Sequence, residues 1–156
     1  MQDDEVVAHG VFPSGEDWQL AVTVRSDNVM TVLSVTRQGA AVFGGGMGGP
    51  ALAENETLNL YWGREGDFLG VVVRTAESVA HLTLTVGSAE PTALQLYPIP
   101  RCPGVNVAAF GLTVDRVEEI SLSARDEDGH MVETHSLPVA PPARPAGTNG
   151  GGWAAG

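Results

Sequence analysis

The chain has no lysine, and arginine supplies all eight basic residues against nineteen acidic ones. The resulting formal net charge of −11 argues against nucleic acid and anionic membrane as partners, because both require a cationic footprint. An acidic surface of this kind is typical of proteins that depend on charge for solubility. The absence of lysine, beside abundant Ala, Gly, Val and Arg, is typical of the coding bias of GC-rich bacteria and indicates a bacterial origin.

Long apolar runs and paired cysteines are also missing. No stretch approaches the roughly 18–20 apolar residues of a membrane span, so we expect no direct membrane insertion. Cys102 is the only cysteine, which excludes an internal disulfide. Arg101 beside it could favour a thiolate, but no histidine is near in sequence, and we expect Cys102 to be a small apolar filler. The acidic start, Met1–Glu5, is unlike a secretory signal, so we expect a cytoplasmic protein, or an extracytoplasmic one if the chain is an excised ectodomain.

The clearest pattern that is present has a period of two. Apolar and polar residues alternate through Trp18–Arg25, Leu82–Val86 and Ile120–Arg125. Successive side chains of a strand point to opposite faces, so this pattern predicts sheets with one face buried and one exposed. Trp18 falls on the buried face, and His81 falls on the solvent face of its strand.

Strands of this length, separated by turn signals every 8–12 residues or so, predict an all-β fold. We expect an antiparallel β-sandwich over residues 1–137, immunoglobulin-like in the loose sense, either as one unit or as two small sheet units packed together. The expected strands are Val6–His9, Asp17–Arg25, Val29–Thr36, Ala40–Phe43, Thr57–Trp62, Phe68–Arg74, Ala80–Val86, Thr92–Leu96, Val105–Phe110, Val117–Arg125 and His130–His135. Residues 138–156 are rich in Pro and Gly and predict a disordered, flexible tail.

The glycine run Gly44–Gly49 formally matches a dinucleotide fingerprint. That chemistry requires a preceding strand and a following helix whose N-terminus faces the pyrophosphate. Here Pro50–Ala53 leads at once into polar residues and another strand. We therefore expect a flexible glycine-rich loop or bend and no bound nucleotide.

Oxygen-rich residues gather at Asp126–Gly129, with Glu133 further on, and such loops can hold calcium. The spacing does not follow an EF-hand loop, and a hairpin turn with Gly129 in a left-handed conformation accounts for the same residues. His130 and His135 are five apart on one strand and must point to opposite faces, so they do not suit a shared zinc ion. We expect no metal site and no cofactor.

Catalytic patterns are equally sparse. No Gly-x-Ser-x-Gly elbow occurs, and the paired carboxylates Glu118 and Glu119 are adjacent rather than opposed across a cleft. The sequence therefore provides no candidate catalytic residue and predicts that the protein is not an enzyme.

Three aromatic residues are candidates for binding. Tyr61 and Trp62 are neighbours on a strand, so their side chains must point to opposite faces, and we expect one of them to reach the surface. Trp153 stands at the end of the Pro/Gly-rich tail, and tryptophan is enriched at binding hot spots. A docked Trp153, on a partner or on the chain's own sandwich, is one interpretation, and a chance residue in a flexible tail is the other.

Four segments together resemble a loose group of uncharacterised actinobacterial β-rich proteins. They are the opening with Val7, Gly10, Trp18 and Leu20, the run Gly44–Gly49, the strand Val79–Leu84 and the hairpin Ala124–Gly129. The resemblance spans most of residues 6–135. Members of that group often carry an upstream membrane anchor, for which this chain shows no counterpart, and the resemblance implies no activity.

These observations predict a non-enzymatic binding or assembly module that acts through a sheet face or edge, with a tethering tail. Its expected partner is another protein or a second copy of the chain. The alternative is a carbohydrate- or small-ligand-binding β-sandwich that uses surface aromatics around Tyr61 and Trp62.

Overall fold

The computed structural model describes residues 5–26, 28–49, 52, 56–87, 89–113 and 119–138. Within these ranges the chain is all-β and contains no helix, hence none that could span a membrane. The strands are β1 (Glu5–Val11), β2 (Asp17–Arg25), β3 (Asn28–Arg37), β4 (Ala40–Met47), β5 (Leu58–Glu65), β6 (Phe68–Ala76), β7 (His81–Val86), β8 (Thr92–Leu94), β9 (Tyr97–Pro98), β10 (Val105–Thr113), β11 (Glu119–Arg125) and β12 (Met131–Pro138).

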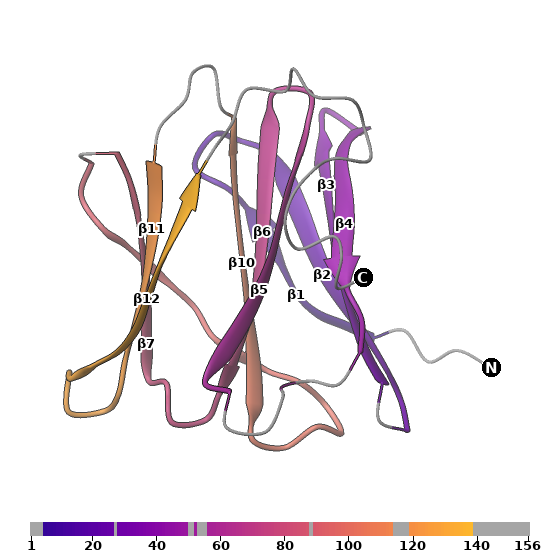
Figure 1. The fold of residues 1–156 in the computed structure, drawn as a ribbon. Helices are drawn as coiled ribbons and strands as arrows, with labels where there is room; N and C mark the ends of the chain where they lie inside the picture. The colour runs from indigo at the N-terminus through magenta and orange to yellow at the C-terminus, as the bar shows by residue number, and fades with distance from the viewer. Residues whose placement is uncertain are drawn as a thin grey trace.

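The strands form three four-stranded antiparallel sheets. The N-terminal sheet has the order β1-β2-β3-β4, the middle sheet β5-β6-β10-β9 and the C-terminal sheet β12-β11-β7-β8. Figure 1 shows the middle sheet between the other two, and one hydrophobic core fills each of the two interlayer spaces. The predicted all-β antiparallel sandwich is confirmed, and it has three layers where an immunoglobulin-type sandwich has two.

Strand β6 shows why the middle sheet takes the central position. Every residue from Phe68 to Thr75 is buried, whereas β2 and β3 alternate between buried and accessible residues. A near-continuous apolar run is typical of a strand covered on both faces. Leu69, Val71 and Val73 pack toward the C-terminal sheet, and Phe68 and Val72 toward the N-terminal sheet.

Each of the eleven predicted strands overlaps an observed one, and among the strands of the described residues only the two-residue β9 is not predicted. The glycine run, however, is not a loop, because Gly44–Gly46 lie within β4 and pair with β3. The physical reason is close packing. A Cβ atom on Gly46 would stand 1.8 Å from the Thr31 carbonyl oxygen, so only glycine lets the strands approach this closely.

The predicted orientations of Trp18 and His81 are confirmed. Trp18 is half-buried at the margin of the core between the N-terminal and middle sheets. Its ring stacks on Phe12 with centroids 5.5 Å apart and planes within 13°. His81 is exposed on the outer face of the C-terminal sheet.

A buried arginine joins the middle sheet to the N-terminal sheet. Arg74 is 1% exposed, and its Nη1 donates to the Val29 carbonyl at 2.7 Å and to the Thr31 hydroxyl at 3.0 Å. Its Nη2 donates to the Gly48 carbonyl at 3.0 Å. Burial lowers the pKa of Arg74 to about 10, so the guanidinium remains charged at neutral pH. One side chain thus fixes β6 to β3 and to the end of β4.

A buried carboxylate holds the opposite end of the same two sheets. Glu16 is 2% exposed and accepts hydrogen bonds from Ser14, from Thr113 of β10 at 3.1 Å and from Arg37 at 3.2 Å. Burial alone would raise the pKa of this carboxyl, but the hydrogen bonds outweigh it and lower the pKa. Arg37 also approaches Asp67 in the β5–β6 turn at 3.6 Å.

The last strand of the described residues, β12, ends at Pro138, the first residue of the predicted tail 138–156. Residues 139–156 lie outside the described residues, so the domain boundary near residue 137 and the disordered tail stay predictions.

Candidate functional site

A groove of about 470 Å³ lies between the middle and C-terminal sheets at the edges formed by β5 and β12. Both sheets contribute to it from their outermost strands. Its lining consists of Glu56, Thr57, Leu58, Asn59 and Leu60 on one side and Glu133, His135 and Leu137 on the other.

Both strands that border the groove are sheet edges. Within the described residues, β5 pairs only with β6, and β12 pairs only with β11. An edge strand of an antiparallel sheet directs alternate N–H and C=O groups away from its neighbour, where another strand can bind them. Each strand is eight residues long, or about 27 Å when extended.

The β5 wall is apolar. Leu58 and Leu60 lie opposite Thr75 and Val73 of β6 and belong to the core between the middle and C-terminal sheets. Leu58 is buried, whereas Leu60 is half-buried. The core is therefore only partly closed at this edge, where an incoming side chain can cover Leu60.

The β12 wall carries polar groups where apolar ones are the rule. Glu133, His135 and Leu137 pair with Ala124, Leu122 and Ile120, all of which are buried in the core, so these three β12 residues share the inward face. Only Leu137 is apolar. The His135 Nε2 atom lies 2.5 Å from the Glu133 Oε2 atom, and the two side chains are 37% and 32% exposed.

Sequence reasoning missed this pair. From the sequence, His135 is considered only with His130 as a zinc ligand, and Glu133 only with Asp126–Gly129 as a calcium ligand. The signal was the spacing of two between Glu133 and His135, which places both side chains on one face of a strand. That this face points inward depends on the pairing with β11, which the sequence does not reveal.

The groove carries a negative charge. Glu133 contributes a carboxylate, and neither arginine nor lysine is among the lining residues. The Asn59 side-chain amide donates to Glu56 Oε1 at 3.3 Å, and Asn59 lies opposite Arg74, so the Glu56 carboxylate is held on the Arg74 side of β5. The site therefore combines a leucine-lined wall with the carboxylate of Glu133.

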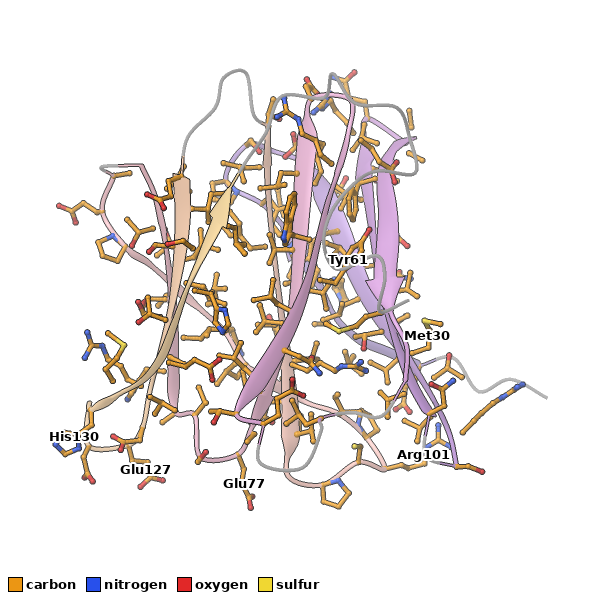
Figure 2. The ribbon with its side chains drawn as sticks, viewed as in Figure 1. Met30, Tyr61, Glu77, Arg101, Glu127 and His130 are labelled. Atoms are coloured by element: carbon orange, nitrogen blue, oxygen red, sulfur yellow. The ribbon has the colours of Figure 1, made fainter. Side chains whose placement is uncertain are left out.

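Of the predicted binding residues, Tyr61 is not at the surface. It is 2% exposed, lies between the middle and N-terminal sheets (Figure 2) and belongs to their shared core. Burial, and then the nearby Glu65 carboxylate, raise the pKa of its hydroxyl. Trp62 is half-buried and packs against the other core. The two rings point to opposite faces, as predicted. The middle sheet is covered on both faces, so Tyr61 does not reach the surface, whereas Trp62 stays partly accessible.

Trp153, the third predicted binding residue, lies outside the described residues, and its role stays a prediction. Cys102 packs against the core between the N-terminal and middle sheets, as expected for an apolar filler.

The acidic hairpin forms the predicted turn. Gly129 has a φ of 86°, and Asp126 Oδ1 accepts from the backbone N–H groups of His130 at 2.9 Å and Asp128 at 3.0 Å. These hydrogen bonds, that from His130 first, lower the pKa of Asp126. Ligand-type atoms of Asp126, Asp128 and His130 lie within 4.8 Å of one another, but the turn already accounts for this geometry.

No protein-family model, no curated protein and no solved structure matches this chain. The resemblance to actinobacterial β-rich proteins therefore stays a prediction.

Proposed function

We propose that the protein is a non-enzymatic binding module that captures an extended segment of a partner protein at the groove between β5 and β12. The observation that supports this most strongly is the position of the groove. It lies between two strand edges, each unpaired on one side within the described residues. Extended peptides commonly bind in this way, with affinity from main-chain hydrogen bonds and specificity from pockets for alternate side chains.

The exposed side chains of β12 support the same function. The large apolar side chains exposed among the described residues are Val6, Val11, Met30, Met131 and Val132, and the last two stand at the start of β12. A strand added along this edge would cover them. An edge strand that exposes apolar residues and borders a groove is a ready template for a further strand.

Carbohydrate binding through surface aromatics has less support. Tyr61 is buried, and no aromatic side chain is among the large exposed apolar residues of the described chain. A sugar-binding platform of stacked rings would require at least one such side chain.

A library of displayed nonapeptides without charge bias provides the test. The affinity of the selected peptides is then measured for the wild type and for two variants, Leu60→Trp, which fills the groove, and Ser123→Arg. Ser123 pairs with Thr83 and Thr134 on the outer face of the C-terminal sheet and serves as the matched control. We expect Leu60→Trp to weaken binding at least tenfold and Ser123→Arg to leave it unchanged.

Thermal melts verify that Leu60→Trp is folded, and Thr57→Arg, at the rim of the groove, gives a second obstruction. Failure to enrich any peptide, or equal binding by the wild type and both groove variants, would exclude the groove as the binding site.

A further inference from the structure

We infer that the bound segment is basic: an extended strand with alternating apolar and cationic side chains that adds to the free edge of β12. This inference rests on the proposed function and specifies the chemical class of the partner.

The inward-facing carboxylate of Glu133 favours a cationic side chain on the incoming strand. It shares its face of β12 with the core residue Leu137, yet the side chain is still 32% exposed. An apolar strand laid over this edge would remove the carboxylate from water with only the His135 ring as its partner, which is unfavourable. Inward-pointing charges on an edge strand oppose apolar strand addition for this reason. A lysine or arginine on the incoming strand removes the penalty.

The charge around the groove favours the same kind of partner. The His135 imidazole lies beside the Glu133 carboxylate, and no arginine or lysine is among the described residues that line the groove. The protein as a whole carries a formal charge of −11. Its field attracts a basic segment and opposes a second copy of the same chain.

Exposed apolar side chains distinguish β12 from β5 as the strand to which the partner adds. Met131 and Val132 are 49% and 38% exposed, whereas the apolar residues at the start of β5 are buried or half-buried. Along β12, apolar and acidic side chains are thus both present for an incoming strand. This combination selects a partner in which apolar and cationic residues alternate.

Three octapeptides provide the test on the full chain: Val-Lys repeated four times, and the same with Ser or Glu in place of Lys. Affinity is measured by fluorescence anisotropy at low and at physiological salt. We expect the Lys peptide to bind at least tenfold more tightly than the Ser peptide, and the Glu peptide not to bind. Added salt should weaken the Lys peptide selectively.

Two variants that change the charge equally localise the effect. Glu133→Gln should remove most of the preference for the Lys peptide, about tenfold in affinity. Glu127→Gln removes the same charge at the exposed hairpin tip (Figure 2) and should leave the affinity unchanged. Methylation of alternate backbone nitrogens on one edge of the Lys peptide should abolish binding, because it removes the donors that pair with β12.

The contrary outcomes separate the two proposals. Equal binding of the Lys and Ser peptides, both blocked by Leu60→Trp, would refute the basic partner and retain the groove as a binding site. Peptides that bind equally to wild type and Leu60→Trp would refute both proposals. Equal losses in Glu133→Gln and Glu127→Gln would indicate attraction to the whole acidic surface. A dimer in light scattering that Leu60→Trp dissolves would make a second copy the occupant. Each of these last two results overturns the inference.

Discussion

Gly45 of β4 lies directly against the ring of Tyr61 of β5, so that a Cβ atom at position 45 would stand 2.5 Å from the Tyr61 hydroxyl oxygen. Gly63 approaches the same oxygen, with a Cβ distance of 2.6 Å. In the same core a Cβ on Gly70 would stand 2.6 Å from the Phe43 ring. Aromatic rings of the N-terminal and middle sheets therefore fit over glycines, and this fit sets how closely the two layers approach.

Gly45→Ala should destabilise the protein by about 1–3 kcal/mol, the usual cost of overpacking a dense core. Gly44→Ala is the matched control, because a Cβ atom at that position meets nothing within 4 Å and should cost little. Tyr61→Phe removes the nearest atom and should rescue part of the Gly45→Ala loss in a double-mutant cycle by urea denaturation. Equal stability of the Gly44 and Gly45 variants would contradict this packing.

Arg74→Met should cost about 2–4 kcal/mol, because it leaves the Val29 and Gly48 carbonyls without their donor in a buried site. The neighbouring Thr75 is a contrasting case. Its buried hydroxyl has no hydrogen-bond partner among the described residues, so Thr75→Val should be neutral or stabilising. Denaturant melts that rank the two variants in reverse would refute the assigned role of Arg74.

Glu16 should make the protein sensitive to acid. Its pKa in the folded state is lower than the ordinary value of 4.5, so the unfolded state takes up the proton first as the pH falls. The stabilisation is complete above that value and is lost as the pH falls from it through the folded-state pKa. Glu16→Gln should cost about 1–3 kcal/mol at neutral pH and less at low pH. The free energy of unfolding of the wild type and of Glu16→Gln is compared as the pH is lowered. If both lose stability in parallel between pH 5 and about pH 2, a group other than Glu16 causes the acid sensitivity.

Trp18→Ala should destabilise by an amount near the lower end of the ~3–5 kcal/mol typical of core tryptophans, because Trp18 is only half-buried. His81→Ala, on an exposed outer face, should stay within roughly 0.5 kcal/mol of the wild type. Thermal or chemical denaturation of the two variants checks this order. A larger loss of stability in His81→Ala than in Trp18→Ala would contradict the assignment of Trp18 to a buried face and of His81 to an exposed face.

Much of this fold could be predicted from the sequence because alternation is a local signal. The period of two in β2, β7 and β11 gave their positions and buried faces correctly. The pattern cannot report which sheets stack, so the third layer was not foreseen. Gly45 shows the same limit, because a glycine required by a tyrosine sixteen residues away is indistinguishable in sequence from a glycine in a loop.

The candidate site was much harder to predict. The groove is created by β5 and β12, which are far apart in sequence and meet only because two different sheets end on the same side of the stack. Tyr61 and Trp62 are predicted to bind a ligand because they are large aromatic residues. In the structure, Tyr61 belongs to the core on one face of the middle sheet, and Trp62 packs against the core on the other face. The polar pair Glu133 and His135 becomes unusual only when their strand is known to face inward at an edge.

The most direct test of the account is a two-dimensional NMR titration of the full chain with the Val-Lys peptide. Strand addition predicts that the largest shift changes, and new protection of backbone amides from exchange, fall on Met131–Leu137 and on Leu58–Leu60. Protection in β12 should exceed that in β5, because β12 is the edge that gains hydrogen bonds. Changes centred instead on the outer face of the C-terminal sheet, around Thr83 and Ser123, or an absence of new protection in β12, would contradict the account.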